Sequence, residues 1–131
     1  MDTDPTPAPA SRPPVLPHVL RLDLLGDDEP LRQARRFVRL QAEQLGLEDA
    51  ADDAVQVTAE LLGGLGAGSS PTVLRVGEAA GALVVGVDVR FADGRTRPVL
   101  SGHTRDLLRQ LSGETGWSPT DGGAQLWCRV P

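Results

Sequence analysis

Four short segments of this chain are rich in apolar side chains, and in the clearest of them apolar and polar side chains alternate in steps of two. On residues 18–24, for example, Leu20, Leu22 and Leu24 share one face and polar side chains take the other. Since side chains on a β-strand point alternately to its two faces, this pattern predicts strands with one buried face. The predicted strands span residues 18–24, 72–76, 83–91 and 124–130.

Three other segments carry apolar residues three or four positions apart, the spacing of one face of an α-helix. They span residues 29–45, 48–62 and 104–111. Gly46 follows the first segment, at the position where helices commonly end. A loop is expected over residues 63–71, because the glycines there are unfavourable inside a helix.

The order of these elements is strand, helix, helix, hairpin, short helix and strand. It predicts an α+β domain, a two-layer α/β sandwich with a mainly antiparallel mixed sheet and helices on one face. Residues 18–131 form this single domain. Residues 1–17 hold six of the eleven prolines and are expected to be a disordered leader, with an extended docking peptide as the alternative.

Composition narrows the classes of function. The net charge is −5, which is the wrong sign for a nucleic-acid-binding domain. No apolar run approaches the roughly 20 residues that span a bilayer, and no signal peptide is recognisable. Cys128 is the single cysteine, which fits a reducing compartment, so we expect a cytoplasmic protein without nucleic-acid or membrane partners.

The 131 residues include no Lys, Ile, Tyr or Asn, and all thirteen basic residues are arginine. This bias indicates a GC-rich genome. Four of the arginines lie on the side of the first helix opposite its apolar face. They are either a solvated face or a surface for a partner: Arg32, Arg35, Arg36 and Arg39.

Three stretches resemble a known family in their order and spacing: ARRFVR at residues 34–39, DDAVQVTAELL at residues 52–62 and PTDGGAQLWCRVP at residues 119–131. They are similar to small ATP-binding regulators of actinobacteria, related to the anti-sigma-factor serine kinases of the histidine-kinase-like ATPase (GHKL) superfamily. The resemblance covers residues 20–131 and implies the histidine-kinase-like ATPase fold. It also implies a shortened ATP lid between residues 91 and 102.

In that family the second helix carries a Glu-x-x-x-Asn box. The Glu acts as general base, and the Asn holds the Mg²⁺ that bridges the phosphates. Here Glu60 takes the first position and Gly64 the second. Because phosphoryl transfer depends on positioning and charge neutralisation, Glu60 is expected to be vestigial.

Two further family motifs also depart from the pattern. Phe91 stands where an Asp would bind adenine, although a register shift of two would bring in Asp93 and Gly94 instead. Gly102 begins the glycine turn that holds phosphates, but Thr104 replaces its second glycine. The resemblance therefore implies a former nucleotide cleft at Gly64, Phe91, Asp93, Gly94, Gly102 and Thr104.

Two other groups of residues are weaker candidates for chemistry. Ser101, His103 and Asp106 contain the residue types of a catalytic triad, but three residues on one short turn seldom have its geometry. His18, His103 and Cys128 lack metal-ligand spacing.

The expected function is a regulatory protein-binding module of anti-sigma-factor type that has lost ATP binding and kinase activity. The resemblance implies a partner such as a sigma factor or an anti-sigma antagonist, and no cofactor is expected. One alternative is an active ATP- and Mg²⁺-dependent serine/threonine kinase. Another is a structural or assembly subunit that uses the former cleft as an interface, including a homodimer.

Overall fold

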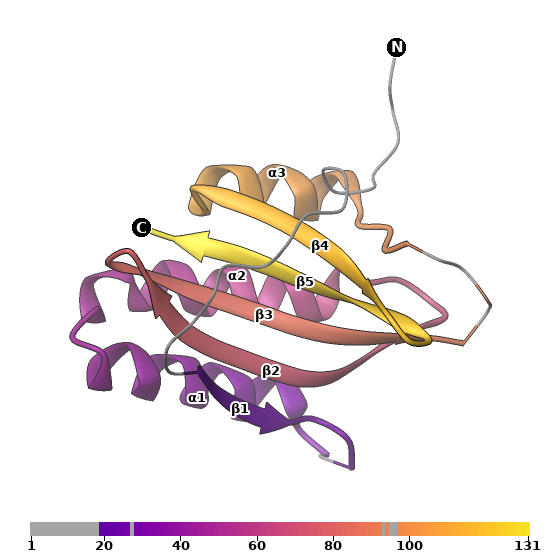
Figure 1. Ribbon diagram of the computed structural model, residues 1–131, viewed down its shortest axis with the longest axis horizontal. Coiled ribbons are helices and arrows are strands. Elements are labelled where there is room, and N and C mark those ends of the chain that lie inside the picture. Colours follow the sequence, from indigo (N-terminus) through magenta and orange to yellow (C-terminus); the bar gives the residue numbers. More distant parts are fainter. Residues whose placement is uncertain (1–18, 27, 93, 95–96) are drawn as a thin grey trace.

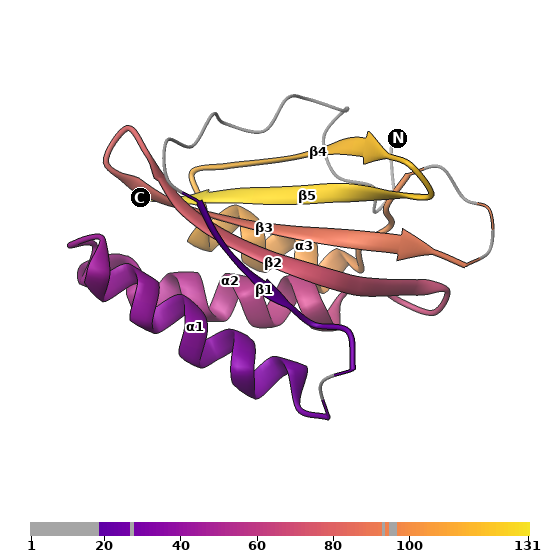
Figure 2. The same cartoon turned by 60° about the horizontal axis from the view of Figure 1, so that its bottom comes forward.

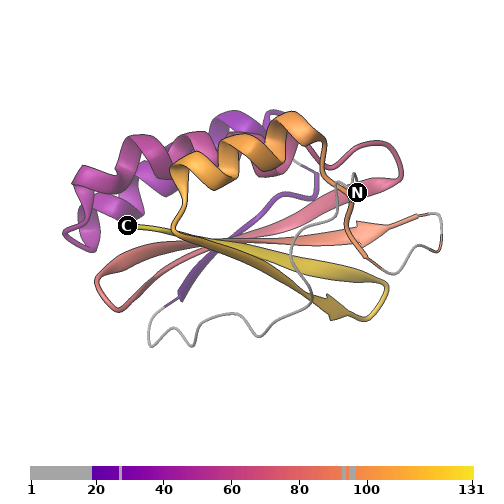
Figure 3. The ribbon, with the colours of Figure 1, turned by 90° about the horizontal axis from the view of Figure 1, so that it is seen from above.

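Three helices cover one face of a five-stranded sheet in the computed structural model of this chain (Figures 1 and 3). The structure describes residues 19–26, 28–92, 94 and 97–131. The predicted leader, residues 1–17, therefore lies outside the described residues. The elements are β1 (Val19–Asp23), α1 (Pro30–Gln44), the short 3-10 helix η1 (Glu48–Ala50), α2 (Ala51–Gly63), β2 (Ser69–Ala79), β3 (Ala82–Phe91), α3 (Gly102–Leu111), β4 (Glu114–Thr120) and β5 (Gly123–Val130).

The sheet has the strand order β1-β2-β3-β5-β4, and each neighbouring pair is antiparallel. The α+β class and the two-layer sandwich are thus confirmed. The expectation of a mixed sheet is wrong for the described residues, because every strand runs antiparallel to each of its neighbours in the sheet. The more specific histidine-kinase-like fold stays a prediction.

The core lies between the inner face of the sheet and the helices. Alternate residues of β3 are fully buried, and Val85 pairs with Cys128 and Val87 with Leu126 on β5. On α1, Ala34, Val38 and Ala42 are fully buried. Small side chains on this face let α1 pack closely against α2, which also contacts α3. The alternation and the helical spacing of the sequence therefore place the core correctly.

Gly46 ends α1 as expected. Its φ of 72° lies in the left-handed region, which glycine enters without the steric cost of a Cβ atom. The N–H group of Leu47 then donates to the carbonyl oxygen of Ala42 at 2.8 Å, so the turn satisfies one of the free carbonyls at the helix end.

The edge strand β4 is absent from the predicted elements. Its sequence, ETGWSPT, has one large apolar residue and a proline, so it lacks the alternation that marks a half-buried strand. Proline is tolerated because β4 pairs only with β5 among the described strands. No helix in the described ranges is long and apolar enough to cross a membrane.

Candidate functional site

A chain of hydrogen bonds joins α3 to α2 at the position of the predicted cleft. Thr104 Oγ1 donates to Glu60 Oε2 at 3.2 Å. Ser101 Oγ donates to Thr104 Oγ1 at 2.9 Å and accepts from the Thr104 N–H group at 3.1 Å. Thr104 is only 3% exposed, so its hydroxyl is a buried link between the Glu60 carboxylate and the N-terminus of α3.

Local sequence explains how α3 presents this threonine. Ser101 is the N-cap residue of α3 and has extended backbone angles. Its side chain satisfies one of the N–H groups that the first helical turn leaves free. Thr104 is three residues beyond the cap, so the same hydrogen bonds that start the helix also fix the threonine toward α2.

Gly64 lies directly against this link. It is the C-cap residue of α2, and its N–H group donates to the carbonyl oxygen of Glu60 at 2.8 Å. A Cβ atom at Gly64 would lie 2.4 Å from Thr104 Oγ1, 2.7 Å from Thr104 Cγ2 and 2.8 Å from the Glu60 carbonyl oxygen. Real Cβ atoms essentially never make such contacts, so Thr104 occupies the space that any side chain at residue 64 would need.

A shallow hollow of about 370 Å³ remains beside the link. It lies between the loop that follows α2 and the segment that precedes α3. Its lining residues carry no charged side chain in the described part of the chain: Gly63, Gly64, Leu65, Gly66, Ala67, Val99, Leu100 and Ser101. The hollow therefore offers backbone groups, small apolar side chains and one hydroxyl to a ligand.

The structure brings Glu60, Gly64 and Thr104 together, and Gly102 is the first residue of α3 beside them. Of the predicted cleft residues that the structure describes, Gly64 alone lines the hollow. Phe91 ends β3 and packs half-buried against the core, and Gly94 is exposed. Asp93, the alternative adenine residue, lies outside the described residues.

The fold does not arrange the weaker candidate residues that the structure describes for triad catalysis or for metal binding. Ser101 uses its hydroxyl to cap α3 and to bond Thr104, while His103 is exposed. Within the described residues, no three His, Cys, Asp or Glu side chains are grouped so that they could hold a metal ion.

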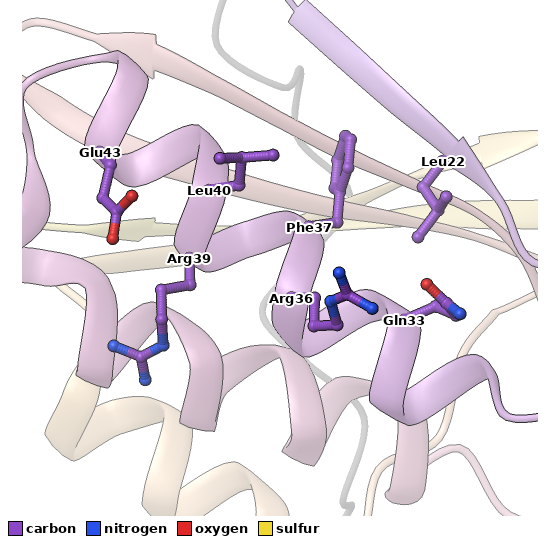
Figure 4. Close-up of a pocket in the computed structure, with 7 residues that line it drawn as sticks. All are labelled: Leu22, Gln33, Arg36, Phe37, Arg39, Leu40 and Glu43. Carbon is purple, nitrogen blue, oxygen red and sulfur yellow. The ribbon is translucent and has the colours of Figure 1, made fainter.

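The four predicted surface arginines are all exposed on α1. Arg32 pairs with Glu29 at 3.3 Å and Arg39 with Asp52 at 3.0 Å. Both pairs are largely solvent-exposed, so they contribute little to stability. Arg36 and Arg39 line a second hollow, of about 480 Å³, together with Leu22, Gln33, Phe37, Leu40 and Glu43 (Figure 4).

Sequence reasoning named Ser101 only as part of a triad and did not include the apolar residues of this second hollow. The capping role of Ser101 has a local signal, because serine directly before a segment with helical spacing is a preferred N-cap residue. The apolar hollow has no local signal, since Leu22 and Phe37 come from different elements.

Cys128 is the one group near the core whose pKa is clearly displaced. Burial raises the pKa of its thiol to about 12. The sequence contains no Lys or Tyr, so no other side chain has an ordinary pKa between about 8 and 11. The change in the free energy of unfolding at alkaline pH therefore tests the burial of the Cys128 thiol.

We expect the free energy of unfolding to fall by about 1.5 kcal/mol between pH 8 and pH 10. In this range the thiol of the unfolded chain loses its proton, whereas the folded chain keeps it, so rising pH favours the unfolded state. Urea unfolding at the two pH values measures the change. Cys128→Ala is the control and should remove most of the pH dependence; equal slopes for both proteins would show that the thiol ionises in the folded state.

Comparison with known proteins adds no relative: neither the protein-family models nor the curated proteins searched contain a match to this chain. Its function is therefore inferred from the geometry of the site and from the resemblance of its motifs.

Proposed function

We propose that this chain is a regulatory protein-binding module of anti-sigma-factor type that no longer binds ATP or transfers phosphate. The observation that carries the proposal is the position of Thr104. Its side chain lies where a metal ligand at residue 64 would have to be, and its hydroxyl bonds the Glu60 carboxylate. The Glu60 carboxylate, to which the resemblance assigns the role of general base, thus helps to hold α2 to α3.

This contact weighs against the alternative of an active serine/threonine kinase. Phosphoryl transfer needs Mg²⁺ to neutralise the phosphates and a free carboxylate to orient the nucleophile. Gly64 provides no side-chain ligand, and one oxygen of Glu60 already accepts a part-buried hydrogen bond from Thr104. Among the described residues, the lining of the remaining hollow has no arginine to compensate the charge of a triphosphate.

The partner class follows from the resemblance and from the surface. Members of the family that the motifs resemble act on sigma factors and their antagonists, so a regulatory protein of this kind is the proposed partner. The exposed arginines of α1 give the acidic chain one basic surface on which such a partner would bind.

Thermal unfolding with nucleotide tests the loss of ATP binding. We expect the same melting temperature in buffer, with ATP and EDTA, and with ATP and excess Mg²⁺. A ligand at 100 times its Kd stabilises the folded state by about 2.7 kcal/mol, which would raise the melting temperature of a domain of this size by several degrees. A Mg²⁺-dependent increase of that kind would contradict the proposal and favour the kinase.

A further inference from the structure

The hollow beside α1 lies between this helix and Leu22 of the edge strand β1 (Figure 4). Figure 2 shows α1 and β1 as neighbouring elements. The hollow's α1 residues, which recur three or four positions apart along the helix, are Gln33, Arg36, Phe37, Arg39, Leu40 and Glu43. Residues 33 to 43 extend about 15 Å along the helix axis at 1.5 Å per residue. The hollow is therefore an elongated groove, called the α1–β1 groove below, that runs parallel to α1.

Apolar side chains form the floor of the α1–β1 groove. Leu22 and Phe37 are half-buried, and Leu40 is 50% exposed. Five of the six large apolar side chains that are exposed in the described residues lie on β1, on the connection after it or on α1. They are Val19, Leu20, Leu25, Leu31 and Leu40. Of these five, Leu40 lines the groove itself.

Arginines border this apolar floor. Arg36 lines the groove directly, and no carboxylate in the described ranges forms an ion pair with it. Arg32 and Arg39 pair only with exposed carboxylates, which a partner can displace at small cost. The whole chain carries a charge of −5, so this basic border stands out from an acidic surface and favours an acidic partner.

A second copy of the chain fits this surface poorly. In a two-fold dimer the same patch faces its own copy, so the two copies would bring four groove arginines together. Glu43 is the single acidic residue that lines the groove. The two copies of Glu43 would therefore face four arginines, which leaves the paired surfaces with an excess of positive charge.

We propose that the α1–β1 groove binds an amphipathic helix of a partner protein, with an apolar stripe bordered by Asp or Glu residues. This proposal rests on the protein-binding role proposed above and adds where and what the module binds. The apolar stripe packs on Leu22, Phe37 and Leu40. The acidic border pairs with Arg36 and its neighbouring arginines, in the manner of other helix-in-groove complexes.

Selection from a displayed library of random 18-residue peptides against the full chain tests the groove. We expect the enriched peptides to combine Leu or Phe at helical spacing with Asp or Glu, and to gain helical circular dichroism on binding. Fluorescence anisotropy of an enriched peptide then compares variants. Arg36→Glu and Leu40→Asp, both at exposed positions, should each weaken binding at least tenfold.

Arg90→Glu is the matched control, because Arg90 is an exposed arginine on β3 that does not line the groove. It changes the net charge equally and should leave the affinity within twofold of the wild type. Failure to enrich peptides, or enriched peptides that bind Arg36→Glu and Leu40→Asp normally, would overturn the proposal. A wild-type dimer that Leu40→Asp dissociates would assign the groove to a second copy. None of these outcomes depends on ATP, so the loss of nucleotide binding stands or falls separately.

Discussion

Replacing Gly64 with asparagine, the residue that holds Mg²⁺ in the kinases that the motifs resemble, is expected to destabilise this protein and to leave it without ATP binding. The new Cβ atom would meet Thr104 Oγ1 at 2.4 Å and Thr104 Cγ2 at 2.7 Å. Overpacking of this kind costs about 1–3 kcal/mol, and urea unfolding measures it. The backbone at Gly64 is not strained, since its φ is −96°, so the cost comes from contacts alone.

Gly63→Ala is the matched control for this substitution. Gly63 is the last residue of α2, and a Cβ atom there would meet nothing within 4 Å. Alanine is the better helix former, so this variant should be unchanged or more stable by up to about 1 kcal/mol. A Gly64→Asn protein as stable as the Gly63→Ala control would show that Thr104 moves aside and that the site is not blocked.

A double variant separates the steric clash with Thr104 from other causes of the stability lost in Gly64→Asn. Thr104→Ala removes both atoms that approach residue 64 most closely, so Gly64→Asn combined with Thr104→Ala should be more stable than the sum of the single changes by about 1 kcal/mol. The relief is partial, because the Glu60 carbonyl oxygen would remain at 2.8 Å from the new Cβ atom. Mg²⁺-dependent ATP binding by the double variant alone would identify Thr104 as the residue that closed the site.

The contact between Thr104 and Glu60 illustrates which parts of the site a single sequence can predict. The two residues are 44 positions apart, and neither has a local pattern that points to the other. The resemblance assigns both to one cleft, and the fold brings them into contact. The resemblance could not predict that the Thr104 side chain would fill the space beside Gly64, because this depends on how closely α3 approaches α2.

The fold was predictable where burial leaves a periodic pattern. Alternation predicted β3 and helical spacing predicted α1, since each buries one continuous face against the core. β4 was not predictable, because a short edge strand with one tryptophan, a proline and several polar residues has no such pattern. The α1–β1 groove was not predictable either. Its floor combines Leu22 with Phe37, and only the packing of α1 beneath β1 brings these together.

The largest loss of stability is expected from Gly123→Ala, at the start of β5. A Cβ atom there would lie 1.8 Å from the carbonyl oxygen of Val89 and 2.9 Å from its carbonyl carbon. These are backbone atoms of the central strand β3, so no side chain can rotate away and the two strands must separate. We expect a loss of more than about 3 kcal/mol, beyond the usual range for single substitutions, measured by urea unfolding.

Gly86→Ala tests whether the loss comes from this close approach rather than from alanine in the sheet. Gly86 lies on β3 opposite Trp127 of β5, and a Cβ atom there would meet its nearest neighbour, the Leu126 carbonyl oxygen, at an ordinary 3.5 Å. Its stability should stay within about 1 kcal/mol of the wild type.

The comparison of Gly123→Ala with Gly86→Ala also bears on the candidate site. The Phe91 N–H group bonds the Gly122 carbonyl oxygen at 3.0 Å, and the Ala92 N–H group bonds that of Gly68 at 2.8 Å. The close pairing at Gly123 therefore anchors the end of β3, and with it the glycine loop that follows α2. Equal stability of the two variants would mean that β3 and β5 separate at this end without cost, and that the loop is held by α2 alone.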